Sequence, residues 1–370
     1  MGYPLAMLLY ARIRPRPVRR RAGFSPTVTV IVAARDEEAS IAARVGNLLE
    51  QVYDPDRLDV VVASDGSIDR TDEIVRKLSE HEPRVQLLRV AAGGKVAAQH
   101  QASRVARGEV LAFTDANATW EPDALARLVE PLADPDVGYV CGRLELVDSG
   151  GSNKEGVYWR YELRLREAES TLGSITGGNG SIYALWRRDY VEDDPRFGHD
   201  LGLPYTTVQR GKRAVYEPLA ISTEPQALSS EDEYERKVRM FAQSWGHLLT
   251  GRMLKPVDPV YAVQLFSHRV LRYASGLLHV GLLATTVRLV RHGRVYRLAL
   301  AAQVGLVAAA AAGRGGRRVP GARFAHYYVT LVVATLAGLT EQLRRGTPLR
   351  WGQAAGTRKA TSPDGADRDS

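Results

Sequence analysis

Short β-branched runs alternate with amphipathic segments between residues 27 and 147, and this alternation is the strongest constraint on the fold. Four of these runs are predicted to be strands, at residues 27–34, 58–64, 85–90 and 109–114. Polar turn residues and then helical spacing follow each run, and after the first run one helical face carries Ile41, Val45, Leu48 and Leu49. Strands that alternate with helices build a largely parallel sheet. The sequence therefore predicts an α/β fold.

The pattern is less regular between residues 150 and 256. Helices are predicted over about 154–172 and 231–249, with a glycine-rich loop between them. Ser230 and Glu233 have the spacing of a capping box, which marks the start of the second helix. A shorter helix is expected from about Glu121, because the proline that follows can occupy a first turn without losing a hydrogen bond.

Three weakly polar stretches follow residue 261, and arginine-rich segments separate them. They cover about 273–290, 298–313 and 324–340. We expect them to span a membrane or to lie in its interface, since His279 and Arg288 would be costly at bilayer depth. Buried helices of a soluble domain are the alternative. Arginines follow all three stretches, so the positive-inside rule gives no orientation.

The N-terminal segment joins ten apolar residues to a basic run at residues 12–21. A signal peptide has the opposite order, and a spanning helix needs about 20 residues. We expect the cytosolic end of a membrane helix that begins earlier, or a short interfacial anchor, with the arginines on the cytoplasmic side. Much of the arginine behind the net charge of +8 flanks apolar segments. Cys141 is the only cysteine, which excludes an intrachain disulfide.

Acidic residues follow three of the predicted strands. They occur at residues 36–38, at Asp65 and at Asp115. Because the carboxyl ends of parallel strands meet at one edge of a sheet, these side chains are expected to converge where such sheets bind ligands. A carboxylate there can accept a hydrogen bond from a base or a ribose, or bind Mg²⁺ or Mn²⁺ that bridges two phosphates. The sequence contains no GxxxxGK[ST] phosphate loop, so carboxylates plus a metal are the expected solution.

These motifs resemble those of glycosyltransferase family 2, whose members have the GT-A fold. Residues 36–38 stand where the family has Asn-Glu-Glu after its first strand, with Asp36 in place of the asparagine. Residues 64–71 match the family's Ser-Asp-Gly-Ser-x-Asp-x-Thr turn, and residues 94–95 match its Gly-Lys pair. The Asp-x-Asp metal motif appears as residues 115–117, with a neutral amide in place of its second carboxylate.

The resemblance implies a nucleotide-sugar site at this edge of the sheet. Asp65 would meet the uracil or ribose, and the same pocket would include Ala33, Arg35 and Glu37. Lys95 would bring a cation near the donor. Asp115 would hold Mg²⁺ or Mn²⁺, with Asn117 as a weaker second ligand.

Segments farther along resemble the acceptor side of membrane-bound family members, at residues 158–170 and 177–190. Asp200 occupies the place of the family's general base, and His199 stands where another acid is usual. Asp193 and Asp194 are rivals for the role of base.

The helix at 231–249 carries three candidates for binding the diphosphate or the acceptor, Arg236, Lys237 and Arg239. Acidic residues stand four positions before each of them, so surface ion pairs are an equally good interpretation. The Gln-x-x-Arg-Trp motif of processive synthases is not reproduced, although Gln243 and Trp245 fall nearby.

Together these features predict an inverting, metal-dependent glycosyltransferase that moves a sugar from a nucleotide-sugar, expected to be a UDP-sugar, to a hydroxyl of a glycan or lipid. We expect the cell membrane as its location, the catalytic domain on the cytoplasmic face, and no nucleic-acid partner. The expected division is a truncated anchor with its basic run (1–22), a GT-A domain (23–255), membrane-associated helices (256–345) and a disordered tail (346–370).

Two other functions compete with this prediction. A nucleotidyltransferase also uses an α/β sheet and metal-bound carboxylates. It would be expected to have a glycine-rich signature near the first strand, where this sequence is acidic. A basic nucleic-acid or lipid-binding protein would need a patch that mixes basic and aromatic residues. The basic residues of this sequence mostly flank apolar segments instead.

Overall fold

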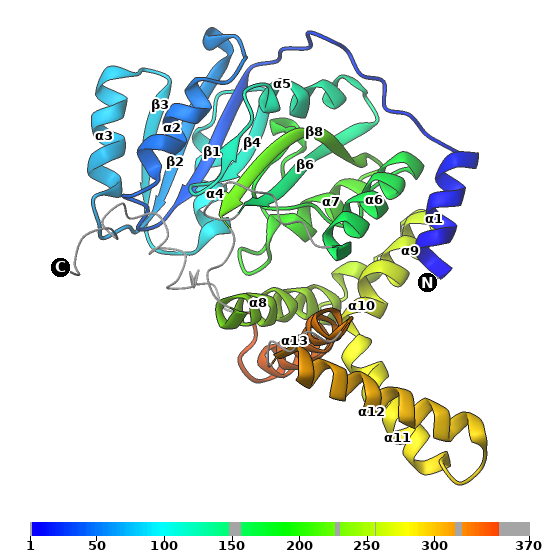
Figure 1. Cartoon of the computed structure of the whole chain (residues 1–370). Helices are drawn as coiled ribbons and strands as arrows, with labels where there is room; N and C mark the ends of the chain where they lie inside the picture. The colour runs from blue at the N-terminus through cyan, green and yellow to red at the C-terminus, as the bar shows by residue number, and fades with distance from the viewer. Residues whose placement is uncertain (1, 148–156, 226–229, 256, 315–319, 348–370) are drawn as a thin grey trace, which may run out of the picture. The chain divides into compact units, whose positions relative to one another are not determined.

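The computed structural model describes residues 2–147, 157–225, 230–255, 257–314 and 320–347 (Figure 1). Most of the predicted tail, the predicted helix start at residue 154 and the side chain of Ser230 lie outside the described residues. The chain forms two compact units. Residues 1–228 and 253–265 belong to the first, and residues 229–252 and 266–347 to the second.

The first unit is built on an eight-stranded sheet with the order β3-β2-β1-β4-β7-β6-β8-β5. Its strands are β1 Val28–Ala34, β2 Leu58–Asp65, β3 Val85–Val90, β4 Val110–Asp115, β5 Thr119–Trp120, β6 Val137–Val147, β7 Tyr183–Trp186 and β8 Arg213–Pro225. The four predicted strands are β1 to β4, and they pair in parallel. Strand β7 runs antiparallel to both β4 and β6. The prediction of an α/β fold is confirmed, and the sheet is mixed.

Helices cover both faces of this sheet. One apolar core packs against α2 Ile41–Leu49, α3 Thr71–His81 and α5 Ala124–Val129. The other packs against α4 Lys95–Val105, α6 Val157–Leu172 and α7 His199–Gln209. Alternate β1 residues enter opposite cores, Val30 one and Ile31 the other, which explains why the strand is apolar throughout.

The helix expected from about Glu121 begins three residues later, and this boundary prediction is wrong. The backbone N–H of Glu121 donates to the carbonyl of Ile221, 3.0 Å away, so this residue continues the pairing of β5 with β8. Tertiary pairing therefore delays the helix until Ala124.

The N-terminal segment packs on the first unit as α1 Gly2–Ile13. Met7 of α1 enters an apolar cluster with Leu165 and Leu172 of α6, and the Tyr3 hydroxyl donates to Glu169, 2.6 Å away. The basic run that follows is also attached, because the Arg213 guanidinium donates to the carbonyl of Arg16 at 2.8 Å. The helix leaves large apolar side chains exposed, among them Leu5, Leu9 and Ile13.

The second unit is helical, with α8 Ser230–Leu249, α10 Leu271–Tyr273, α11 Ser275–Leu289, α12 Arg294–Arg314 and α13 Ala322–Arg345. Helices α8 and α13 approach closely, because a Cβ on Gly338 would lie 2.7 Å from the Cβ of Phe241. Trp245 is buried at this crossing, and its indole N–H donates to the carbonyl of Thr335 at 3.0 Å. Trp245 is therefore a packing residue within this unit.

Two helices of this unit, α12 and α13, are long and apolar enough to cross a membrane. A third span is possible by length if the helices that meet at residues 273–275, bent by 65°, form one broken segment. Large apolar side chains on α11 and α12 are half or more exposed, including Leu278, Val287, Leu298 and Val307. His279 faces its own unit, since its ring nitrogens contact the Ser275 carbonyl and the Tyr328 hydroxyl at 2.8 and 2.9 Å. These surfaces suit a membrane.

A substitution at Gly108 tests how closely the residues before β4 approach β1. A Cβ at this position would lie 2.4 Å from the backbone nitrogen of Thr29. Gly108→Ala should therefore lower the free energy of unfolding by about 1–3 kcal/mol, as measured by urea or thermal unfolding. Gly46→Ala is the control, because nothing lies within 4 Å of its added Cβ, and it should raise stability by up to about 1 kcal/mol. Unchanged stability in Gly108→Ala would contradict this packing.

Candidate active site

The ends of three parallel strands lie level at one edge of the sheet. Ala33 of β1 pairs in register with Asp115 of β4, and Ala34 pairs with Ser64 of β2. Asp65 ends β2 one residue later. The pairing thus brings together the strand-end acids of β2 and β4, with buried Ala33 between them.

Asp65 is fully buried and holds the loop that leads into α4. Its Oδ1 accepts hydrogen bonds from the backbone N–H groups of Gly93 and Gly94, at 2.7 and 3.1 Å. The Arg35 guanidinium lies 3.7 Å from its Oδ2. Gly94 has a φ of +95°, a conformation that favours glycine. Asp65 therefore fixes the backbone immediately before Lys95.

The acidic residues after β1 join their loop to the loop after β2. Asp36 has a left-handed backbone, and its Oδ1 accepts from the Ile68 N–H at 2.8 Å. The Glu37 N–H donates to the Thr71 hydroxyl at 2.8 Å. The Glu37 carboxylate accepts from the Ser40 hydroxyl at 2.8 Å. These contacts make residues 36–38 a rigid rim of the site.

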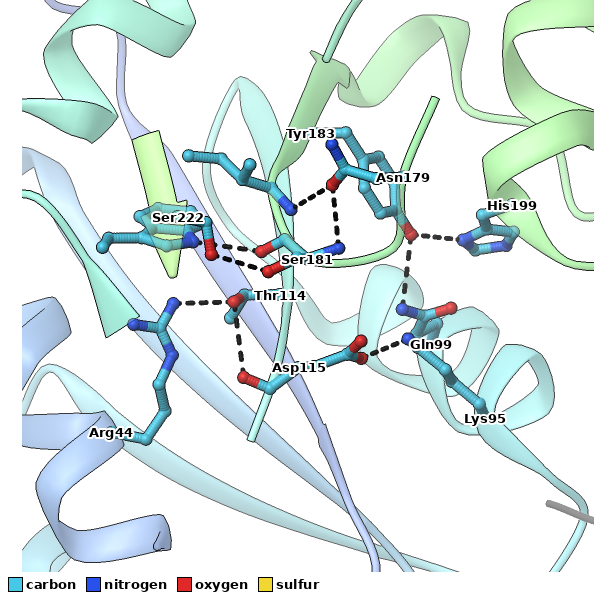
Figure 2. A network of polar contacts seen from close by, with 12 residues as sticks. Arg44, Lys95, Gln99, Thr114, Asp115, Asn179, Ser181, Tyr183, His199 and Ser222 are labelled. Carbon is cyan, nitrogen blue, oxygen red and sulfur yellow. Dashed lines mark hydrogen bonds and ion pairs between the residues drawn. The ribbon is translucent and has the colours of Figure 1, made fainter. Parts of the chain in front are cut away.

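Lys95, the first residue of α4, forms an ion pair with Asp115 at the end of β4 (Figure 2). Both side chains keep about a fifth of their surface exposed, so the pair is open to a ligand. A Cβ on Gly180 would lie 3.0 Å from the lysine Nζ and 3.6 Å from the aspartate Oδ2. The loop at residues 177–180 therefore passes directly against this pair. Asn117 lies half-buried in the turn that follows β4.

A second cation, Arg44 of α2, lies beneath the same strand end, and sequence reasoning missed it. Its guanidinium donates to the Thr114 hydroxyl at 2.7 Å (Figure 2). It also lies over the Trp120 ring, 4.9 Å from the centroid. Burial lowers the pKa of Arg44 to about 9, although the Asp115 and Glu224 carboxylates act in the opposite direction. The helical pattern gives no signal for it, because a charged residue in an amphipathic helix is normally assigned to the solvent face.

Asp200 lies half-buried in the first turn of α7. Its backbone carbonyl accepts from the N–H of Gly178 at 2.6 Å, which ties it to the glycine-rich loop beside the Lys95–Asp115 pair. The two rival acids have partners in their own loop. Arg196 Nε donates to Asp194 Oδ1 at 2.9 Å, and the Asp193 carboxylate accepts from the N–H of Asp194 at 2.8 Å.

Arg236 and Arg239 lie on α8, in the second unit. Arg239 Nη1 is 3.8 Å from the Glu235 carboxylate, and Lys237 pairs with Glu233. The exposed Arg239–Glu235 pair corresponds to the surface-pair interpretation of this helix, whereas the Lys237 side chain is largely buried.

The donor set at the edge of the sheet suits a divalent ion that takes most of its ligands from a substrate. Within the part of the chain that the structure describes, no three His, Cys, Asp or Glu side chains form a metal cluster. Asp115 already has a positive charge beside it in Lys95. A site with one carboxylate, supplemented by phosphate oxygens and water, matches the coordination that Mg²⁺ prefers in nucleotide enzymes.

Sequence comparison connects this geometry to known proteins. The model of Glycosyl transferase family 2 matches residues 29–194. A beta-monoglucosyldiacylglycerol synthase from Nostoc sp. is 34% identical over 202 residues, covering 49% of this chain and 42% of that protein. An N-acetylglucosaminyltransferase from Rhizobium meliloti is 29% identical over 246 residues, covering 60% of this chain and 57% of that protein. The chain spans about half the length of these curated relatives.

The fold is similar to that of the mannosyltransferase PcManGT from Pyrobaculum calidifontis, solved in complex with GDP-Man and Mn²⁺. The two structures have a TM-score of 0.71 and 24% sequence identity, over 93% of this chain and 95% of that one. This likeness shows that the chain has the GT-A fold.

Two buried histidines behind the site should make the free energy of unfolding depend on pH. Burial lowers the pKa of both His100 and His199, so each takes up a proton less readily in the folded protein than in the unfolded chain. In the unfolded chain a histidine takes up a proton below a pH of about 6.5. The free energy of unfolding should therefore fall as the pH drops below about 6.5, because the unfolded state takes up these protons more readily than the folded state.

Chemical denaturation across this pH range measures the effect. His199→Asn should lose stability less steeply than the wild type between these pH values, since one of the two neutral histidines is gone. Equal slopes for the two proteins would contradict the buried neutral state of His199.

Proposed function

Because this chain belongs to glycosyl transferase family 2, we propose that it is a membrane-associated inverting glycosyltransferase. It moves a sugar from a nucleotide-sugar, with UDP-sugars as the first candidates, to a hydroxyl of a lipid or glycan. The relatives named for glucosyldiacylglycerol synthesis and N-acetylglucosaminyl transfer support these two acceptor classes.

The observation that carries the proposal is the Lys95–Asp115 pair, held between the Asp65-anchored loop and the loop at residues 177–180. Lys95 would bind the diphosphate of the donor, and the rim with Arg35 and Glu37 would surround its nucleoside. Asp115, with Asn117 as second ligand, would hold Mg²⁺ or Mn²⁺. When bound, the ion would neutralise charge that develops on the leaving diphosphate. The neighbouring fold that contains GDP-Man and Mn²⁺ supports this assignment.

Asp200 is the proposed general base. It would take the proton from the acceptor hydroxyl while that oxygen forms a bond to the anomeric carbon. The bond from this carbon to the nucleoside diphosphate breaks at the same time, so the configuration inverts. Lys95 would stabilise the departing phosphate, and buried Arg44 adds positive potential beneath Asp115.

The exposed apolar surfaces of α11, α12 and α13 support attachment to a membrane, where a lipid acceptor would be available. We propose the cytoplasmic face for the catalytic unit, because nucleotide-sugars are expected there and the chain has a single cysteine. A nucleotidyltransferase or a basic nucleic-acid-binding protein is disfavoured by the family match at residues 29–194.

A panel experiment tests the proposal. The purified full chain is incubated with UDP- and GDP-sugars, Mn²⁺ or Mg²⁺, and vesicles with or without diacylglycerol, or with short glycans. We expect release of nucleoside diphosphate together with a glycosylated product. No transfer with any combination, alongside salt-sensitive RNA binding, would favour the nucleic-acid alternative.

Asp115→Asn separates the proposed metal role from folding. Transfer should fall by at least about 100-fold, and Mn²⁺ should no longer strengthen binding of UDP or GDP, because the charged ligand is lost. Asp123→Asn is the control, since this carboxylate is exposed on a different loop and pairs only with Arg127 among the described contacts. Full activity in Asp115→Asn would exclude the metal site.

Asp200→Asn tests the base. We expect transfer to fall by about 100-fold or more, with nucleoside diphosphate affinity within about twofold of the wild type, because only proton removal is affected. Asp193→Asn and Asp194→Asn are the matched comparisons. If either of them abolishes transfer while Asp200→Asn does not, the base is assigned to that residue instead.

A further inference from the structure

A series of hydrogen bonds runs behind the candidate active site, and we name its five members the buried histidine–tyrosine chain: Gln99, Tyr183, His199, Tyr190 and His100. Gln99 Nε2 lies 3.3 Å from the Tyr183 hydroxyl, which lies 2.8 Å from His199 Nδ1 (Figure 2). His199 Nε2 is 3.4 Å from the Tyr190 hydroxyl, which is 2.6 Å from His100 Nδ1. The chain ends where His100 Nε2 meets the carbonyl of Asp193 at 2.8 Å.

The carbonyl at the end of the chain fixes the direction of every hydrogen bond in it. A carbonyl only accepts, so His100 Nε2 carries a proton, and the Nδ1 of a neutral His100 accepts from Tyr190. The Tyr190 oxygen is then free to accept from His199 Nε2. His199 Nδ1 in turn accepts from the Tyr183 hydroxyl, which leaves the Tyr183 oxygen to accept from the Gln99 amide. All donors point the same way, and the Gln99 amide at the start can only donate through its nitrogen.

Aromatic packing holds the same side chains in place. The ring of Phe113 in β4 stacks on Tyr183 with centroids 4.8 Å apart, and it meets His199 edge to face at 5.5 Å. Phe113 stands two residues before Asp115, so both side chains lie on the same face of β4. Tyr183 and His199 are also almost completely buried. Neither ring can turn without disturbing this stack.

The buried histidine–tyrosine chain connects the two halves of the proposed site. Gln99 and His100 belong to α4, whose first residue is Lys95. His199 is the first residue of α7, and Asp200 follows it in the same turn. We propose that the buried histidine–tyrosine chain positions Asp200 relative to Lys95 and Asp115, with His199 and Tyr183 acting as positioning residues. This inference rests on the proposed function, in which Asp200 is the general base.

The direction of the hydrogen bonds explains why the acid that is usual in the family is unsuitable at residue 199. A carboxylate there would offer only acceptors. The single proton of Tyr190 already goes to His100, so Tyr190 would present an oxygen lone pair to that carboxylate. An acid at position 199 would therefore interrupt the buried histidine–tyrosine chain, although it restores the family pattern.

Transfer kinetics of four variants test the proposal, using the donor and acceptor that the panel identifies. Tyr183→Phe keeps the stacked ring and removes the donor to His199, and kcat should fall about fivefold to tenfold. His199→Glu should lower kcat by at least about tenfold, whereas His199→Asn, which keeps an acceptor near the Nδ1 position, should retain more activity than His199→Glu. The donor KM should stay within about twofold in all of them.

Tyr139→Phe is the matched control. Its ring stacks on Tyr183 with centroids 5.7 Å apart, but its hydroxyl is not a member of the chain, so kcat should not change. Thermal unfolding identifies any variant that fails to fold. Wild-type kcat in Tyr183→Phe, or higher activity in His199→Glu than in His199→Asn, would overturn the inference while leaving the proposed function intact. Absence of transfer in the wild type would instead refute the proposed function.

Nitrogen-15 spectra of histidine-labelled protein provide a measurement that does not depend on activity. We expect His100 and His199 to be neutral at pH 7, with the proton on Nε2 in both. Tyr183→Phe should shift the Nδ1 resonance of His199, because that nitrogen loses its donor. A proton on Nδ1 of either ring would overturn the proposed direction of the chain.

Discussion

The parallel pairing of β1 with β2 and β4 is the constraint on which the candidate active site depends. Its register sets Ala33 opposite Asp115 and Ala34 opposite Ser64, so residues distant in sequence end at one edge of the sheet. The two apolar cores on either face make this register costly to change, since a slip by one residue would turn buried side chains toward the other face. The geometry of the site is thus a property of the whole sheet.

Charges at this edge are arranged in compensated pairs. Asp65 is buried but has two backbone N–H donors and a nearby guanidinium, and Asp115 has Lys95 beside it and Arg44 below. A buried carboxylate without such partners would be strongly destabilising. The more exposed of the two acids is Asp115, and its partner is a lysine on a flexible stem. A ligand could displace that lysine without disturbing the rest of the site.

The apolar strand patterns and the motifs at their ends allowed prediction of β1 to β4 and of the edge where the acids meet. Strands β7 and β8 escaped prediction for physical reasons: β7 has only four residues, and β8 contains Pro218, which argues against a strand in sequence patterns. Helix α7 was missed because it contains Pro204. The buried histidine–tyrosine chain comes from four separated segments, so no local spacing indicates it. Arg44 escaped because burial of a charged residue depends on its tertiary partners.

The central claim is that Asp115 marks the place where a metal and a nucleotide-sugar diphosphate bind. Anomalous scattering from Mn²⁺ in crystals of the full chain with UDP or GDP tests it most directly. We predict a manganese peak beside the Asp115 carboxylate and the nucleotide phosphates, with Lys95 moved from the aspartate to the diphosphate. A nucleotide bound without manganese at Asp115, or bound away from the ends of β1, β2 and β4, would contradict the account.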